Sequence, residues 1–258
     1  MRTIAIVNNK GGVAKTTTAV NLAYLLATAY QKRVLLVDAD GQRNATRTLL
    51  GPGQYDGLMA LIDGIACCYD EVVEPTDIEN LDVIPSSSSL WEIDLKVAQG
   101  RWSGNVFHVL TDLRDNLVED DSYDVMIIDC PPYFSGACIA AIMAADSVIV
   151  PVTPDAYAAE GMADLVKQIH GMRELNSELR VSGCLITQWH NADVVVKAEE
   201  YIRDHSPVHV YINTIRRTDK VLESTWMRES VLAWSPQSAA ARDYRAWVEE
   251  FLDREGMK

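Results

Sequence analysis

The chain opens on Thr3-Ile4-Ala5-Ile6-Val7, followed shortly by Lys10-Gly11-Gly12-Val13-Ala14-Lys15-Thr16-Thr17. The first stretch is apolar at every position after Thr3, as buried strands of parallel sheets are. The second combines a glycine-rich turn with the start of a helical pattern. Backbone N–H groups in such a turn, followed by a helix N-terminus, form a cradle for phosphate oxygens. A phosphate site after the first strand of an α/β fold is therefore predicted.

Apolar runs alternate with helical patterns along the rest of the chain. We expect further strands at 33–37, 81–85, 124–129, 147–151, 181–186 and 208–212, and helices at 16–30, 106–118, 158–175, 194–205 and 239–252. This alternation indicates a doubly wound, mainly parallel sheet with helices on both faces. Since no repeat, low-complexity tract or linker interrupts the pattern, we predict a single domain over residues 1–258.

The composition excludes several classes of protein. Hydrophobic residues make up 48% of the chain, which is enough for a sizeable core. No apolar run reaches the roughly 20 residues that cross a bilayer, and neither a basic leader nor a cleavage site precedes the first strand. Five cysteines without paired spacing favour a reducing compartment, and Cys130, Cys138 and Cys184 have the apolar neighbours of buried thiols. We expect a soluble, cytoplasmic protein.

The net charge of −14 argues against a protein that coats nucleic acid. Much of the acidity is local, however. Residues 63–82 include seven acidic side chains and no basic one, whereas residues 201–258 carry nine of each sign. A small basic patch on one face remains compatible with this distribution.

Two residues of the phosphate loop have the chemistry of a nucleotide site. Lys15 can reach β and γ phosphates, and Thr16 can offer its hydroxyl to Mg²⁺. A turn that merely joins a strand to a helix would not need this Lys-Thr-Thr sequence. Asn9 and Ala14 stand where the general pattern has its first and last glycines, and a left-handed backbone at Ala14 would cost about 1 kcal/mol. ATP and Mg²⁺ are the predicted cofactors.

Two later strands end in carboxylates. One continues as Val37-Asp38-Ala39-Asp40-Gly41-Gln42-Arg43-Asn44-Ala45-Thr46, and the other is Val125-Met126-Ile127-Ile128-Asp129-Cys130-Pro131-Pro132. The second has the form of a Walker B strand, whose aspartate holds Mg²⁺. Taken singly, each segment would also fit a helix cap or a strand that ends in a proline turn. Ligands of open α/β sheets bind at the carboxyl ends of strands, which is where these aspartates fall.

The Lys-Gly-Gly-x-x-x-Lys-Thr-Thr loop resembles the deviant Walker A motif of the ParA/MinD superfamily. Residues 38–46 are similar to its Asp-x-Asp-Pro-Gln-x-Asn-Ala-Thr switch segment, with Gly41 in place of proline, and residues 129–132 to its second switch. The resemblance implies that Lys10 reaches across a dimer to the partner's ATP and that Asp40 positions or activates the attacking water. It also implies a Mg²⁺ site supported by Thr16, Asp38, Asp40 and Asp129.

The resemblance covers most of residues 1–186 and fades beyond them. Residues 214–224 look like the family's Ile-Pro-Arg-x-x-x-x-x-Glu-Ala stretch, with Arg216 where the proline would be. In relatives this loop lies near the adenine, so the resemblance implies adenine contacts at Ile215 and Arg216.

The resemblance implies a ParA-type partition ATPase. ATP and Mg²⁺ would join two subunits into a sandwich dimer that binds DNA without sequence preference and associates with the nucleoid. A ParB-like partner would stimulate slow hydrolysis and release the DNA. The candidates for DNA contact are Arg216, Arg217 and Lys220, and the less favoured candidates are Arg242 and Arg245 of the last helix. A solvated helix face with surface salt bridges would explain these residues equally well. A phosphate loop this near the N-terminus is expected of short ParA proteins, which lack an operator-binding extension.

Three other functions stay open. A membrane-cycling regulator like MinD, or another cargo-positioning ATPase, is the main alternative, although the acid-rich stretch 247–255 would be repelled by an anionic bilayer. An electron-transfer ATPase resembling the nitrogenase iron protein would need further cluster cysteines beside Cys130. A scaffold that binds ATP without turnover would fit the departures at Ala14 and Gly41.

Overall fold

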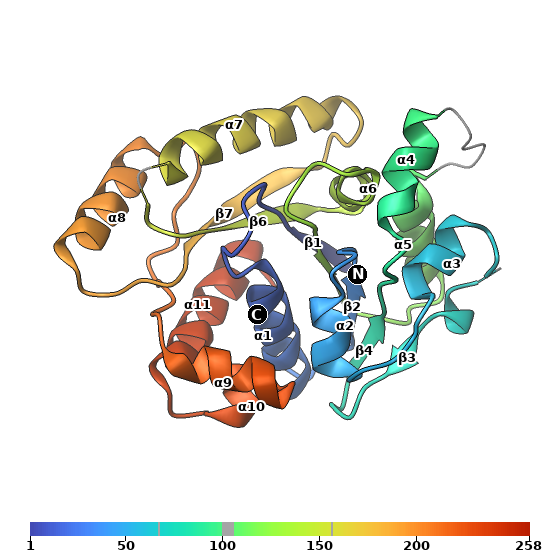
Figure 1. Cartoon of the computed structure of the whole chain (residues 1–258), viewed down its shortest axis with the longest axis horizontal. Coiled ribbons are helices and arrows are strands. Elements are labelled where there is room, and N and C mark those ends of the chain that lie inside the picture. Colours follow the sequence, from blue (N-terminus) through green and yellow to red (C-terminus); the bar gives the residue numbers. More distant parts are fainter. Residues whose placement is uncertain (67, 100–105, 156) are drawn as a thin grey trace.

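The computed structural model describes residues 1–66, 68–99, 106–155 and 157–258, which form a seven-stranded sheet between two layers of helices (Figure 1). In sheet order the strands are β3 (Glu74–Pro75), β4 (Leu81–Ile84), β2 (Val34–Asp38), β5 (Val125–Asp129), β1 (Arg2–Ile6), β6 (Ser147–Val152) and β7 (Arg180–Ile186). Among these described strands, edge strand β3 alone runs antiparallel to its neighbour. The predicted doubly wound, mainly parallel sheet is confirmed.

The described helices are numbered in chain order. They are α1 (Lys15–Thr28), α2 (Asn44–Leu49), α3 (Gly57–Ile62), α4 (Trp91–Ala98), α5 (Val109–Glu119), α6 (Gly136–Ala144), α7 (Ala158–Gly171), α8 (Asp193–His205), α9 (Asp219–Met227), α10 (Val231–Trp234) and α11 (Ala239–Glu255), with short 3-10 turns at Tyr69–Glu71 and Met172–Glu174. The predicted helices 16–30, 106–118, 158–175, 194–205 and 239–252 correspond to α1, α5, α7, α8 and α11.

Successive residues of the central strands face two different cores. Ala5 and Leu35 pack into a core with α5, α6 and α7, whereas Ile4 and Leu36 pack into a core with α1 and α11. Figure 1 shows α1 and α11 on one side of the sheet and α6 and α7 on the other. Neighbouring side chains of a strand point to opposite faces. With both faces covered, most positions of the central strands are apolar, which explains the strand pattern in the sequence.

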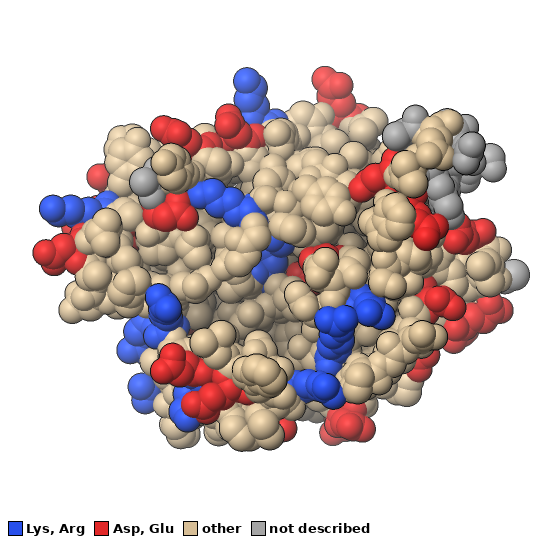
Figure 2. Space-filling view, viewed as in Figure 1, with Lys and Arg blue, Asp and Glu red and all other residues tan. Residues whose placement is uncertain are grey.

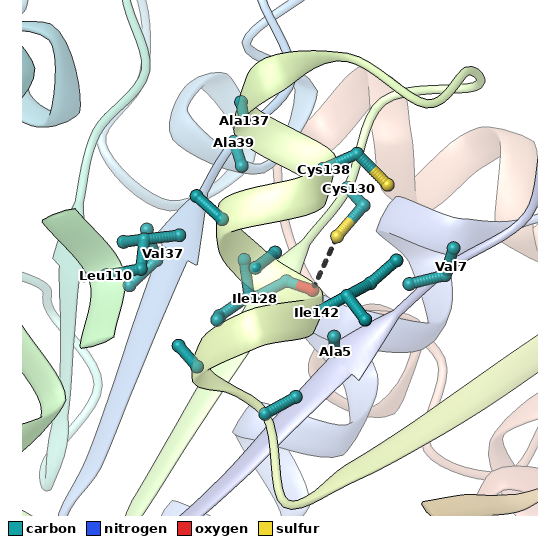
Figure 3. Packing of buried hydrophobic residues seen from close by; sticks show 14 of the residues in the cluster. Ala5, Val7, Val37, Ala39, Leu110, Ile128, Cys130, Ala137, Cys138 and Ile142 are labelled. Carbon is teal, nitrogen blue, oxygen red and sulfur yellow. Dashed lines mark hydrogen bonds between the residues drawn. The ribbon is translucent and has the colours of Figure 1, made fainter. Parts of the chain in front are cut away.

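Helix α6 illustrates an element that hydrophobic periodicity does not reveal. Nearly all of its residues are buried, so the helix is apolar on every side and has no polar face. Figure 3 shows Ile142 of α6 beside Ala5 of β1 and Ile128 of β5. The helix therefore forms part of the interior, over β5 and over β1, the strand that leads to the phosphate loop.

The predicted buried thiols are confirmed. Cys130, Cys138 and Cys184 are buried, Cys68 is exposed, and Cys67 lies outside the described residues. Figure 3 shows Cys130 beside Cys138, which is itself a residue of α6. Because both thiols are in the interior of one subunit, neither is placed to hold an iron–sulfur cluster shared between two subunits.

The strand predicted at 208–212 is wrong. Only an isolated bridge forms there, between Val210 and Cys184 of β7. The chain then turns toward α11, where the N–H groups of Ile212 and Asn213 both donate to the carboxylate of Glu250, at 2.7 and 3.0 Å. A side-chain acceptor on α11 thus replaces the strand partner that continued pairing would need.

The closing helix α11 is amphipathic, as predicted, and its apolar side is part of the core. Tyr244, Trp247, Val248, Phe251 and Leu252 are all fully buried, and α11 packs against α1. This face is therefore not available for insertion into a bilayer. No helix within the described ranges combines the length and apolar character needed to span a membrane.

Candidate functional site

The phosphate loop joins β1 to α1 and contains two left-handed residues. Gly12 has φ 73° and Ala14 has φ 66°. The Ala14 conformation is the one that costs an L-residue about 1 kcal/mol, as foreseen from the sequence. No side chain caps the N-terminus of α1, and a methyl group added at Gly11 or Gly12 would meet no atom within 4 Å. The loop thus exposes a helix N-terminus to open space, as an anion cradle requires.

Lys15 lies inside this loop. The residue is 7% exposed, and its Nζ donates to the carbonyl oxygen of Lys10 at 2.8 Å. Burial lowers the pKa of Lys15, although Asp129 and Asp40 oppose this shift. The ammonium group therefore lies between the loop and the carboxylates at the strand ends.

Two buried aspartates end adjacent strands in the same register. Asp38 of β2 pairs with Asp129 of β5. Asp38 Oδ2 accepts from the backbone and hydroxyl of Thr46, at 2.8 and 2.7 Å, and Oδ1 accepts from Asp40 N at 3.1 Å. Burial raises the pKa of Asp38 to about 6 despite these bonds. Asp38 thus holds the segment that carries Asp40.

Asp129 differs from Asp38 because neither of its oxygens has a hydrogen-bond partner among the described residues. Burial and the neighbouring Asp38 raise its pKa well above the ordinary value. Thr16 lies beside it and offsets part of this rise, although its hydroxyl is not in hydrogen-bonding geometry. An unpartnered buried carboxylate beside a threonine hydroxyl has the donor chemistry of a Mg²⁺ site.

Asp40 lies in a tight turn after β2 and is partly exposed. Its Oδ1 accepts from Gln42 N at 2.9 Å, while its carbonyl oxygen accepts from Arg43 N and Ser86 Oγ, both at 2.8 Å. The backbone of Gly41 is not left-handed, and an added methyl would make only ordinary contacts at 3.8 Å. The structure therefore gives no conformational reason for glycine instead of proline at this position.

Lys10 is directed away from its own loop. Its Nζ forms an ion pair with Asp155 Oδ1 at 3.0 Å and lies 5.8 Å from the centre of the Tyr157 ring. Partial burial pushes the pKa of Asp155 upward, but hydrogen bonds from Lys10, Tyr157 N and Thr153 outweigh it and hold the pKa below its ordinary value. The Lys10 side chain is 36% exposed, so a second molecule can reach this pair.

A cavity of about 370 Å³ lies on the other side of the loop. Its walls bring Gly12, Ala14 and Thr17 together with Ile215 and Arg216. The two segments proposed for phosphate and adenine contacts are therefore adjacent in space. Ile215 is buried and supplies part of the apolar wall.

The basic residues proposed for DNA contact differ in how far they are already paired. Arg216 forms an ion pair with Asp243 at 2.6 Å, and Lys220 pairs with Glu223 at 2.7 Å. Arg217 is exposed and has no ion pair with any residue the structure describes. Of the three, Arg217 therefore has the guanidinium most accessible to a phosphate.

Two residues missed by sequence reasoning hold the phosphate loop from outside. Thr187 Oγ1 donates to the carbonyl oxygen of Val13 at 3.1 Å, and Gln188 Nε2 donates to that of Gly12 at 2.5 Å. Gln188 does so from a left-handed backbone with φ 54°. Bonds to these carbonyls help fix the loop conformation. No sequence signal could have identified this contact, because it joins distant parts of the chain.

Comparison with known proteins establishes the family. The profile of a family described as an AAA domain matches residues 1–181. Chromosome partitioning protein ParA of Caulobacter vibrioides is 33% identical over 260 residues, covering 99% of this chain and 95% of that protein. The chain belongs to the ParA/Soj family. Family member Soj of Bacillus subtilis, a sporulation initiation inhibitor protein, is 36% identical over 251 residues, covering 93% and 94% of the two chains.

Two solved structures of other proteins share the fold. An ATP complex of McdA from Cyanothece superposes with a TM-score of 0.83 at 22% identity, covering 100% of this chain and 97% of that one. Cobyrinic acid a,c-diamide synthase of Mycobacterium smegmatis, solved with an ATP analogue and magnesium, gives a TM-score of 0.82 at 27% identity, covering 99% and 95%. This ParA/Soj family member therefore shares its fold with both of these proteins.

Proposed function

We propose that this chain is a partition or positioning ATPase that ATP and Mg²⁺ switch from monomer to dimer. Membership of the ParA/Soj family and the phosphate loop geometry support this proposal. The M. smegmatis synthase, which shares the fold and was solved with an ATP analogue and magnesium, supports the choice of ligand.

The phosphates of ATP would lie against the loop of residues 10–17, and the base would enter the cavity beside Ile215 and Arg216. Thr16 and Asp129 would hold Mg²⁺, with Asp38 and Asp40 behind them. Within the described residues no cluster of acidic, His or Cys side chains forms a metal cage by itself, and Mg²⁺ usually relies on substrate phosphates to complete its ligands. Bound Mg²⁺ would neutralise charge on the β and γ phosphates.

Asp40 would position the attacking water. It is the strand-end carboxylate that remains partly exposed, whereas Asp38 and Asp129 are fully buried. The ammonium group of Lys15 would compensate negative charge on the phosphates. We expect slow turnover in the isolated chain, because the second lysine is absent from each site until a partner arrives.

The observation that carries the switch is the position of Lys10. Its ammonium group is paired with Asp155 at the exposed edge of the loop, rather than with any group inside its own loop. A lysine in that position can serve a second subunit more easily than its own nucleotide. In the dimer, Lys10 of each subunit would therefore exchange Asp155 for the partner's phosphates.

Sedimentation tests this switch directly. The wild type, Lys10→Ala and the control Lys197→Ala, which changes an exposed lysine of α8, are compared with ATP, with ADP and without nucleotide. We expect a dimer only with ATP in the wild type and the control, and monomers throughout for Lys10→Ala. Dimers that form equally without ATP, or that survive in Lys10→Ala, would contradict the switch.

We further propose that the ATP dimer binds duplex DNA without sequence preference, which would place it on the nucleoid, and that a ParB-like partner stimulates hydrolysis and release. Accessible Arg217 supports the DNA contact. At about 50 mM salt with ATP, Arg217→Ala should weaken binding to duplex of any sequence, and the slope of log affinity against log salt should fall by about 1. The control Arg173→Ala changes another exposed arginine, after α7. If the wild type does not bind duplex DNA under these conditions, the proposed DNA binding is refuted.

A further inference from the structure

A second cavity, of about 420 Å³, opens on the outer side of the phosphate loop helix. It lies between the first turns of α1, helix α2 and the end of α9, and it shares only Thr17 and Thr225 with the cavity proposed for the base. Most of its lining residues have polar side chains, with Thr16, Asn44, Thr48 and Ser224 among them. Apart from Thr16 and Thr17, none of its lining residues has a role in the nucleotide site proposed above.

Two arginines on different elements line this cavity. Arg47 comes from α2, and Arg228 is the residue that ends α9, with a left-handed φ of 59°. Both are exposed, and neither guanidinium group forms an ion pair or hydrogen bond with another residue of the described ranges. The Arg228 side chain extends toward the turn after α2, since its Nη1 would lie 3.8 Å from a methyl group added at Gly51. Figure 2 shows basic side chains over α2 and over the neighbouring end of α9.

Several other polar groups of the wall already have hydrogen-bond partners, whereas the two guanidinium groups do not. The hydroxyls of Thr48, Ser224 and Thr225 donate within their own helices, to carbonyl oxygens of the preceding turn. Glu229 also lines the cavity but forms no ion pair with either arginine. Two like charges on the walls of one cavity, with no carboxylate bonded to them, favour an anion between them.

We propose that this cavity binds a phosphate group between Arg47 and Arg228, in addition to the phosphates of the nucleotide. A guanidinium presents a planar fork of donors that matches phosphate oxygens. The volume exceeds that of a single phosphate, so the group can be free inorganic phosphate or part of a nucleic acid backbone. Both sources present the same oxygens to the two arginines.

The position of the site links phosphate binding to the ATP-dependent switch. This link rests on the proposed function. Helix α2 begins directly after the turn that carries Asp40, and Thr46 of α2 holds Asp38. A phosphate bound to both arginines joins α2 to α9. It therefore fixes the element that positions Asp40, and its release frees that element.

Binding is tested on protein whose phosphate loop is already filled. The chain is saturated with a non-hydrolysable ATP analogue and Mg²⁺, and nucleotide occupancy is measured first, so that failure of the proposed nucleotide site is detected separately. Inorganic phosphate is then titrated by calorimetry, and a fluorescent 15-base-pair duplex is titrated in a parallel arm. The variants are Arg47→Gln and Arg228→Gln, with Arg173→Gln as the matched control.

We expect either single variant to weaken binding of the effective ligand at least about tenfold, because each removes a charge-assisted contact. Arg173→Gln should match the wild type. Weakened binding in the phosphate arm identifies free phosphate as the source, and weakened binding in the duplex arm alone identifies a nucleic acid backbone. If neither ligand binds the loaded protein, or if both variants bind like the wild type, the proposal is overturned.

Discussion

The inner and outer parts of the phosphate loop differ in what their lysines contact. Lys15 is buried against the loop's own carbonyl oxygen, between the phosphate cradle and the strand-end carboxylates. Lys10, five residues earlier, is held by Asp155 at an exposed edge. One short loop thus separates a group suited to its own ligand from a group accessible to another subunit. Ligand affinity and assembly can consequently be changed independently.

The largest expected effect comes from removing the inner lysine. Lys15→Ala should weaken ATP binding by about 100-fold or more, because a buried charge that faces phosphate is lost. Lys10→Ala should leave the ATP affinity of the monomer within about threefold, since an exposed ion pair contributes little. Titration with a fluorescent ATP analogue under monomeric conditions measures both. Similar losses in the two variants would remove the distinction between the two parts of the loop.

The next effect concerns turnover. Asp40→Ala should reduce the ATPase rate by about 100-fold, as expected when a group that assists proton transfer is removed. Its ATP affinity and ATP-dependent dimer should remain, because the Asp40 carboxylate bonds to Gln42 N within its own turn and forms no ion pair with Lys10, which is held by Asp155. A phosphate-release assay beside sedimentation tests this. Equal ATPase rates in wild type and variant would exclude Asp40 from the mechanism.

The next smaller effects are expected from Asp129→Asn, which should stabilise the nucleotide-free protein but weaken ATP binding. Since its pKa is raised in the folded state, folding favours the protonated form, and stability falls as pH rises from about 4 through the folded pKa. Asp129→Asn should therefore raise the melting temperature of the nucleotide-free protein at pH 7 by roughly 3 °C or more, with no gain below pH ~4. Mg²⁺-dependent ATP binding should weaken about tenfold.

Thermal scans across pH, with and without Mg²⁺ and ATP, check this prediction. The matched control is Asp146→Asn, which changes a half-buried aspartate whose carboxylate already accepts from Thr3 N at 2.7 Å. A loss of stability in Asp129→Asn at pH 7 would mean that the buried Asp129 carboxylate does not destabilise the folded protein.

A substitution of Asp155, the partner of Lys10, tests the outer part of the phosphate loop separately. Asp155→Asn removes the charge that holds Lys10, so the ATP dimer should tighten by about twofold to fivefold, the range of a surface ion pair. The dimer dissociation constant from sedimentation equilibrium is the readout, with ATP affinity of the monomer unchanged. A weaker dimer would show that Asp155 supports assembly instead of competing with it.

The smallest effect is expected at the strained residue between the two lysines. Ala14→Gly should stabilise the chain by about 1 kcal/mol, because glycine adopts the left-handed conformation without a Cβ clash. A rise of roughly 2–4 °C in melting temperature would follow for a chain of this size. Differential scanning calorimetry of the nucleotide-free protein measures it. An unchanged or lower melting temperature would show that strain at Ala14 is not a significant cost.

The sequence predicted those parts of the molecule that depend on local pattern. Continuous apolar runs located six of the seven strands, and the carboxylates that follow two of them were expected at the ligand edge. Strand 208–212 failed because Glu250 on α11 takes the backbone donors, and nothing near residue 212 signals that contact. Helix α6 was missed because it is buried on all sides.

The candidate site shows the same division. Loop residues 10–17 and the aspartates could be recognised by their spacing and order, and their roles in catalysis remain predictions. The pairing of Lys10 with Asp155, the bonds from Thr187 and Gln188, and the cavity between Arg47 and Arg228 could not be predicted. Each joins residues far apart in the chain, so each depends on the assembled sheet rather than on local pattern.

The place of β1 has a consequence for how the protein is made. This first strand lies in the middle of the sheet between β5 and β6, and the loop after it is held by Thr187 and Gln188. A growing chain therefore releases its phosphate loop from the ribosome long before the strands and side chains that support it. Such non-local pairing delays folding. Nucleotide cannot meet a finished site until Gln188 and the Ile215 and Arg216 that line the cavity proposed for the base have been synthesised.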